Sequence, residues 1–145
     1  MALQAVGAHA GRGPWDEDLD HIPEVYLRAR GEFLVGTLAG RIVAMGALRH
    51  HDAATARVAR MRVHPELQRC GYGRRVLRRL EARARELGYS RLVLETTPRQ
   101  IAAIGLYRAE GYSERGRGEL DGWEAIFFEK RLRPQSQSDR STSTG

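Results

Sequence analysis

The feature that most restricts how this chain folds is a strand, a glycine-containing loop and a helix that follow one another between residues 55 and 87. Arginine and apolar residues alternate from Thr55 to Val63, as in a half-buried strand, and a shorter apolar strand follows from Arg91 to Thr96. Between them, apolar residues recur with the spacing of an amphipathic helix from Gly73 to Leu87. A strand, a helix and a strand in this order predict two parallel strands joined by a right-handed crossover. The chain is therefore expected to fold as an α/β domain.

The helix predicted from Gly73 to Leu87 has an apolar side and a charged side, and Gly88 is expected to end it. Such a helix packs its apolar side on a sheet and leaves its charged side in water. The apolar side consists of Val76, Leu77, Leu80, Ala84 and Leu87. The side expected to face water consists of Arg75, Arg78, Arg79, Glu81 and Arg85.

Antiparallel strands are predicted on both sides of this unit. Strand-like residues from Phe33 to Leu38 and from Arg41 to Leu48 flank Ala39-Gly40, which is typical of a hairpin turn. Two more strands are expected near residues 112–115 and 123–130. The predicted fold is a mixed, mostly antiparallel sheet with one parallel strand pair, flanked by helices.

A second helix is predicted after the strand that ends at Thr96. Thr97 would be its N-cap, Pro98 its first residue and Gln100 the reciprocal capping partner. The helix is expected to run to about Glu110 and to stop at Gly111.

A single domain over residues 15–132 is expected for a chain of 145 residues. An acidic and then apolar stretch from Trp15 to Arg30 is expected to form a short helix. Residues 1–14 are mostly small, and residues 133–145 are rich in Ser, Thr, Gln and Pro, so both tails are expected to be disordered.

The composition excludes several classes of protein. The single cysteine, Cys70, excludes a disulfide framework, and no apolar run approaches the ~20 residues that span a bilayer. The N-terminus lacks a signal-peptide pattern, so a cytoplasmic protein without a membrane partner is expected. The five histidines lack metal-ligand spacing, so no metal is predicted. Of the 24 Lys and Arg residues only one is Lys, which indicates genomic bias, so the net charge of +6 predicts no nucleic-acid partner.

The loop before the first predicted helix has the features of a phosphate-binding site. Its sequence is Gln68-Arg69-Cys70-Gly71-Tyr72-Gly73-Arg74. The first N–H groups of a helix have no partner within it, and the helix dipole adds positive charge at the same end. Glycines let the backbone approach a phosphate closely. The dinucleotide fingerprint would need a third glycine at Val76, and a Walker loop would need Gly-Lys-Ser/Thr, so neither nucleotide motif fits.

With this loop and the second helix, the sequence resembles the GNAT superfamily of acetyl-CoA-dependent N-acetyltransferases over about residues 15–132. The family's pyrophosphate motif, Gln/Arg-x-x-Gly-x-Gly/Ala, is matched by Gln68, Gly71 and Gly73, after the lead-in RMRVHPELQ. A second family pattern, Asn/Gln-x-x-Ala-x-x-Leu-Tyr followed by Gly-aromatic, is matched by Gln100, Ala103, Leu106, Tyr107, Gly111 and Tyr112.

The resemblance implies that acetyl-CoA is the co-substrate and lies between the two parallel strands, which splay apart. It assigns the pantetheine arm to the strand backbone, and the pyrophosphate to the glycine loop. The residues implied are Met61, Arg62, Val63, Gln68, Arg69, Cys70, Gly71, Tyr72, Gly73 and Arg74, with Gln100 and Ala103 on the second helix. The family usually opens with a further strand, so here that strand is either missing or formed by the N-terminal tail.

The spacing of apolar residues before Val63 allows two kinds of strand. Val58 and Met61 are both core-like but lie three residues apart, which a β-bulge would explain. In a regular strand, Ala59, Met61 and Val63 would point inward instead. The sequence leaves both alternatives open.

Two residues are candidates for proton transfer. The resemblance makes Tyr107 the proton donor to the departing thiolate, although Ala103, Ile104 and Tyr107 also fit one buried helical stripe. Glu95, near the end of its strand, could accept a proton from an amine. A solvent-facing carboxylate without a catalytic role is the alternative for Glu95.

The sequence therefore predicts transfer of an acetyl group from acetyl-CoA to a small-molecule or peptide amine, by direct attack in a ternary complex. A non-catalytic CoA-binding sensor is one alternative, and a basic nucleic-acid-binding module is another. The apolar strand from Ala125 to Phe128 is expected to leave an edge or an apolar face to cover, which predicts a homodimer.

Overall fold

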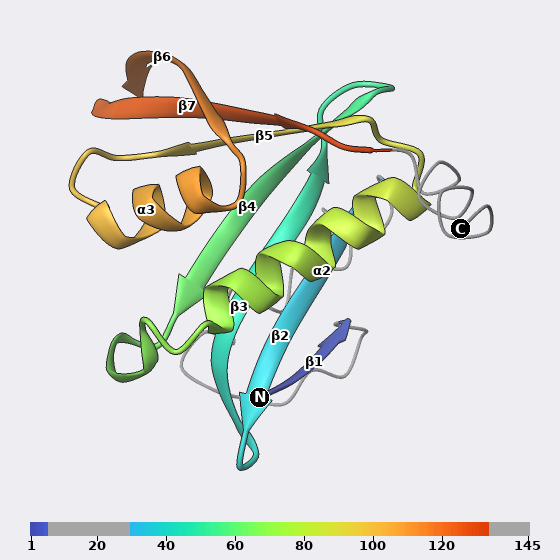
Figure 1. Ribbon diagram of the computed structural model, residues 1–145, viewed down its shortest axis with the longest axis vertical. Coiled ribbons are helices and arrows are strands. Elements are labelled where there is room, and N and C mark those ends of the chain that lie inside the picture. Colours follow the sequence, from blue (N-terminus) through green and yellow to red (C-terminus); the bar gives the residue numbers. More distant parts are fainter. Residues whose placement is uncertain (6–29, 134–145) are drawn as a thin grey trace, which may run out of the picture.

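The structure is a computed structural model that describes residues 1–5 and 30–133. Within these residues, a seven-stranded sheet has the order β1-β2-β3-β4-β5-β7-β6 (Figure 1). All neighbouring strands are antiparallel except β4 and β5, which confirms the predicted mixed sheet with one parallel pair. The strands are β1 (Ala2–Ala5), β2 (Glu32–Leu38), β3 (Arg41–His50), β4 (Thr55–Val63), β5 (Arg91–Thr96), β6 (Ser113–Leu120) and β7 (Trp123–Arg131).

Two described helices, α2 (Tyr72–Glu86) and α3 (Ile101–Ala109), pack on the same face of the sheet. In Figure 1, α2 crosses the strands β2, β3 and β4, and α3 lies beside the space where β4 and β5 diverge. α2 follows the sequence expectation closely, because Gly71 precedes it and Gly88, with φ of 90°, follows it. None of the described helices is long and apolar enough to span a bilayer.

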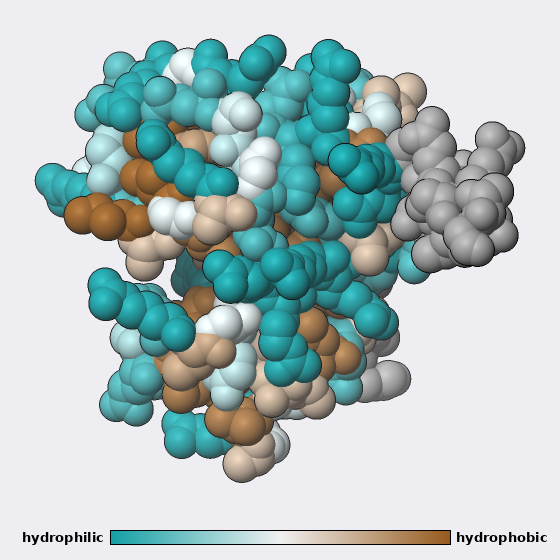
Figure 2. All heavy atoms as spheres, viewed as in Figure 1, coloured by the Kyte–Doolittle hydropathy of each residue, from teal (hydrophilic) through white to brown (hydrophobic). Residues whose placement is uncertain are grey.

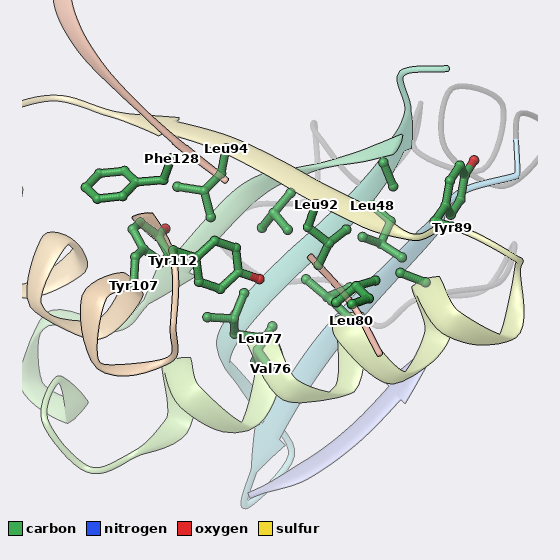
Figure 3. Close-up of a cluster of buried hydrophobic side chains, with 14 of the residues drawn as sticks. Leu48, Val76, Leu77, Leu80, Tyr89, Leu92, Leu94, Tyr107, Tyr112 and Phe128 are labelled. Atoms are coloured by element: carbon green, nitrogen blue, oxygen red, sulfur yellow. The ribbon is translucent and has the colours of Figure 1, made fainter. Parts of the chain in front are cut away.

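The hydrophobic core lies between these helices and the sheet (Figure 3). Val76, Leu77 and Leu80 of α2 are fully buried and belong to the same cluster as Leu92 and Leu94 of β5. This apolar stripe therefore fixes how α2 lies on the sheet, and with it the position of the glycine loop that starts the helix.

The prediction that Glu81 faces water was wrong, because the exposed fraction of this residue is only 4%. It lies four residues after Leu77, so helical geometry places it on the apolar stripe. Its carboxylate accepts a hydrogen bond of 2.8 Å from the Tyr112 hydroxyl and pairs with Lys130 Nζ at 3.1 Å. These partners stand far along the chain, and they compensate the cost of burying the charge.

The second helix begins three residues later than predicted, at Ile101 instead of Pro98. The backbone N–H of Gln100 donates to the Thr97 carbonyl over 3.1 Å, which closes a turn before α3 starts at Ile101. The Gln100 side-chain oxygen accepts from the Thr97 N–H at 3.3 Å and also contacts the Thr96 hydroxyl. The predicted contact between Gln100 and Thr97 is present, but it stabilises a turn between β5 and α3 instead of the first turn of the helix.

The N-terminal tail supplies the first strand, which corrects the expectation of disorder for residues 2–5. β1 pairs with β2 from Ala2↔Thr37 to Ala5↔Leu34, and the side chains of Met1 and Leu3 pack against the core. Residues 15–29 of the helix predicted from Trp15 to Arg30, and residues 134–145 of the predicted C-terminal tail, lie outside the described residues.

The last two strands differ from prediction in length and in position. β6 extends to Leu120, because the turn that reverses the chain lies at Asp121-Gly122, where both residues have positive φ. β7 lies between β5 and β6 and buries Ala125, Ile126 and Phe128. The apolar strand is therefore not an edge, and the edges of the described sheet are β1 and β6.

β4 and β5 separate after a short paired segment, which is the feature that creates the site. They pair only over Thr55–Arg57 and Arg91–Val93. Beyond this segment β4 carries a bulge, because Ala59 faces Ala47 whereas Arg62 faces Met45, and Arg60 has φ of 57°. The structure thus confirms the β-bulge alternative over the regular strand.

Candidate active site

A cleft of about 980 Å³ opens where β4 and β5 diverge. One wall is formed by the end of β4, the short 3-10 helix η2 (Pro65–Leu67) and the start of α2, and the other wall is formed by α3. The hollow is visible at the left edge of the molecule in Figure 2. The cleft therefore lies at the open end of the splayed strand pair, where the first turn of α2 faces it.

The two glycines of the loop are required for different reasons. Gly71 has φ of 84°, a left-handed conformation that side chains with a Cβ rarely adopt, and a Cβ placed there would meet nothing within 4 Å. At Gly73 a Cβ would lie 3.2 Å from Leu106 and 3.4 Å from Val63. Gly71 thus sets the backbone turn that opens α2, and Gly73 lets α2 approach α3 and β4 closely.

The lining of the cleft carries positive charge. Arg62, Arg69 and Arg99 line it and are exposed, and none of these guanidinium groups has an ion-pair partner among the described residues. Arg74 also lines it, but its Nε lies 3.3 Å from Glu110, which pairs with Arg78 as well. These arginines hold the pKa of Glu110 below its usual range, chiefly through the Arg78 hydrogen bond. The described cleft thus offers three uncompensated cations to an anionic ligand.

Tyr107 lies in the core and at the cleft at the same time. Its exposed fraction is 5%, and its ring packs edge-on to Tyr112 with 6.0 Å between ring centroids (Figure 3). Burial, together with the negative charge of Glu95, raises the pKa of Tyr107 to about 12. The hydroxyl therefore keeps its proton at neutral pH and can act as a proton donor.

Glu95 lies on the other face of the sheet from Leu94 and Thr96, which point toward the helices. Its Oε2 atom is 3.0 Å from Nε of Arg57, the last residue of β4 that pairs with β5. The carboxylate is thus held at the point where the strands part.

The structure brings most of the predicted site residues to one cleft. Those that line it are Met61, Arg62, Val63, Gln68, Arg69, Gly71, Gly73, Arg74, Gln100, Ala103 and Tyr107. Three others do not line it. Cys70 is exposed, Tyr72 packs against the core, and Glu95 lies on the other face.

Several residues that line the cleft were not predicted from the sequence. They are Pro65, Arg99, Ile101, Ala102, Gly105 and Leu106. The helical spacing from Gln100 to Tyr107 contained a signal for Leu106, which lies next to Tyr107 on α3. No comparable signal existed for Arg57 as the partner of Glu95, because the pair forms only when β4 and β5 are adjacent.

The sequence pattern and the fold are shared with acetyltransferases. The pattern of the Acetyltransferase (GNAT) family matches residues 7–112. The chain is 40% identical to an IAA acetyltransferase of Azospirillum brasilense over 103 residues, which are 69% of this chain and 67% of that protein. Two mammalian N-acetyltransferase relatives are longer, and the chain spans 56% and 46% of their length.

Solved structures agree with this fold. A GNAT-family acetyltransferase from Staphylococcus aureus Mu50 aligns with a TM-score of 0.74 at 22% identity, over 81% of this chain and 78% of that one. The acetyltransferase yncA from Salmonella typhimurium, whose structure contains acetyl-CoA, aligns with a TM-score of 0.69 at 25% identity, over 81% and 73%. The chain therefore belongs to the acetyltransferase (GNAT) family and is an acyl-CoA-dependent N-acetyltransferase with acetyl-CoA as its co-substrate.

Proposed function

We propose that the protein acetylates an amine by direct attack on acetyl-CoA, with both substrates bound at the splay of β4 and β5. The observation that carries this proposal is the position of the buried, protonated Tyr107 in a cleft that begins at the glycine loop of α2. The cleft suits an anionic ligand, because unpaired helix N–H groups and uncompensated arginines line one end of it.

The two ends of the cleft have different tasks in this proposal. The first turn of α2, with Gly71 and Gly73, holds the pyrophosphate. The β4 segment around the bulge, from Met61 to Val63, offers backbone groups that β5 does not use, and these hold the pantetheine arm as an added strand would. A strand N–H in this segment is also placed to stabilise the oxyanion that develops on the thioester carbonyl.

Acetyl transfer needs proton movements, which we assign to two side chains. A protonated amine gives one proton to Glu95, directly or through water, and its nitrogen then bonds to the acetyl carbon while the C–S bond breaks. Tyr107 donates its proton to the departing sulfur and recovers one from the nitrogen through solvent. Burial in the core suits this role, because it holds the hydroxyl in its protonated form.

The experiment that tests the function is a measurement of CoA release from acetyl-CoA with and without a panel of amines. We expect release that depends on the amine, with formation of the N-acetylated product. The name of the Azospirillum relative makes IAA a further compound to include in the panel. Tight binding of acetyl-CoA without turnover of any amine would favour the sensor instead.

A nucleic-acid-binding role is less well supported. On α2 the arginines alternate with Glu81 and Glu86, and several of them form ion pairs with carboxylates. Retention on nucleic acid at low salt, lost as the salt rises, would favour this alternative.

A homodimer remains our prediction, but at an edge that the sequence did not indicate. β6 is an edge of the described sheet, and all of its residues are exposed. The exposed Leu120 and Trp123 flank the turn that joins it to β7. Unpaired strand edges and exposed apolar residues favour association with a second copy. Light scattering at micromolar concentration should give twice the chain mass of 16.3 kDa, and a mass of one chain would remove the idea.

A further inference from the structure

An ion pair lies on the face of the sheet opposite the helices, at the splayed strands β4 and β5. We call this face the acceptor side. Ala56, Val58, Leu92 and Leu94 point into the core beneath the helices, so Arg57 and Glu95 point to the opposite face. Their Nε and Oε2 atoms lie 3.0 Å apart, at the place where β4 and β5 stop pairing. A positive and a negative charge therefore stand side by side at the base of the splay.

The two charges are partly accessible and are not locked to each other. The side chains are 33% and 21% exposed, so solvent or a ligand can reach part of each, although the Nε atom of Arg57 is itself buried. Although the contact is short, the Nε hydrogen of Arg57 has no hydrogen-bond acceptor within the described part of the chain. The 3.0 Å contact is thus an ion pair without hydrogen-bond geometry, and a ligand with better-directed oxygen atoms can replace part of it.

The pair also lies close to the proposed chemistry. The charge of Glu95 raises the pKa of Tyr107, which places the carboxylate within electrostatic reach of a hydroxyl that lines the cleft. Phe127 of β7 lies opposite Glu95 of β5, and its half-buried ring is on the same face as the carboxylate. The ring also lies close to Gly118 of β6. An acceptor that reaches the thioester from this face meets a carboxylate, a guanidinium and an aromatic ring.

A carboxylate next to a guanidinium group complements a ligand that carries an ammonium group next to a carboxylate. An ammonium group beside Glu95 is in place to lose its proton and attack, and a carboxylate on the neighbouring carbon then lies beside Arg57. Arginine is suited to this contact because its planar donors match the two oxygens of a carboxylate. A peptide amine or a simple amine lacks that carboxylate and would make no ionic contact with Arg57.

We propose that the acceptor is a free α-amino acid with an apolar side chain, whose ammonium group is held by Glu95, whose carboxylate is held by Arg57 and whose side chain packs near Phe127. This assignment rests on the proposed acetyl transfer and adds the class of substrate to it. It makes Arg57 a specificity-determining residue that acts on the acceptor and not on acetyl-CoA.

The test compares three acceptors that differ only in the carboxylate: phenylalanine, phenylalaninamide and 2-phenylethylamine. The wild-type protein should acetylate phenylalanine with the highest kcat/KM. Arg57→Gln should lower the ratio of kcat/KM for phenylalanine to that for phenylalaninamide at least about tenfold, which is the scale expected for a charged hydrogen-bonded contact. A ratio of variant to wild type cancels the intrinsic reactivity of each amine. The KM for acetyl-CoA should not move.

Arg115→Gln is the matched control. Arg115 is an arginine of the edge strand β6 whose Nε lies 3.3 Å from Glu129, and it does not contact Glu95. Its replacement should leave the ratio between the two acceptors at the wild-type value. If Arg57→Gln lowers kcat/KM equally for all three acceptors, or the wild type prefers the acceptors without a carboxylate, the amino-acid assignment is wrong while acetyl transfer stands. If no amine of the broad panel is acetylated, both proposals fail.

Discussion

Replacing Gly71 with glutamate is expected to lower the affinity for acetyl-CoA by more than about 100-fold, because a carboxylate would then stand where the pyrophosphate is proposed to bind and like charges in contact cost several kcal/mol. Gly73→Glu should do the same for an additional reason. A Cβ there would lie 3.2 Å from Leu106 and 3.4 Å from Val63, so the Leu106 side chain would have to shift. Isothermal titration calorimetry with acetyl-CoA measures both effects directly.

Gly40→Glu is the matched control for Gly71→Glu. Gly40 lies in the turn between β2 and β3, has φ of 79° and, like Gly71, has no atom within 4 Å of an added Cβ. Both variants therefore carry the same left-handed backbone strain, which costs about 1 kcal/mol of stability. Only the variant at Gly71 should lose binding. Unchanged affinity in both Gly71→Glu and Gly73→Glu would show that the cofactor lies elsewhere.

The Tyr107→Phe variant should have a kcat about 100-fold below that of the wild type, with little change in acetyl-CoA affinity, because it loses the proposed donor to the departing thiolate and keeps the ring in place. Since the pKa of Tyr107 is raised to about 12, the hydroxyl is protonated throughout the neutral range. The ratio of wild-type to variant kcat should therefore be constant between about pH 7 and 9. Steady-state kinetics under conditions in which chemistry limits turnover give this ratio.

Tyr112→Phe separates a catalytic hydroxyl from a structural one. Tyr112 is buried beside Tyr107, and its hydroxyl donates to the buried carboxylate of Glu81 over 2.8 Å. Its loss should lower the free energy of unfolding by about 2 kcal/mol, the scale of a hydrogen bond to a charged group, while kcat stays within a few-fold. A Tyr107→Phe enzyme with wild-type kcat would assign Tyr107 to the core alone.

The order of helices and strands could be predicted from the sequence, because it depends on local patterns. Helical spacing located α2, alternation located β4, and the glycines at 88 and 111 located the ends of the two helices. The three-residue spacing of Val58 and Met61 allowed either a regular strand or the bulge that the structure has at Arg60. In each case neighbours along the chain determine the conformation, so the sequence carries the information.

Predictions failed where a distant partner changes the energy of a residue. The sequence predicts a solvated charge at Glu81, whereas in the structure Tyr112 and Lys130 pair with its buried carboxylate. Arg74 lines the cleft, but its pairing with Glu110 at 3.3 Å could not be predicted from the sequence. Such pairing depends on the relative position of two helices, which no local pattern specifies.

The sequence by itself determined the strand–loop–helix unit, the left-handed turn that requires glycine at position 71 and the family to which the chain belongs. Tertiary structure decided that residues 2–5 close the sheet as β1, that β7 is internal, and that Arg57 meets Glu95 where the strands part. Local conformation follows from side-chain sterics and hydrophobic spacing. Strand order, the burial of charges and the composition of the acceptor side depend on contacts between segments that are remote in sequence, and only the folded chain brings these together.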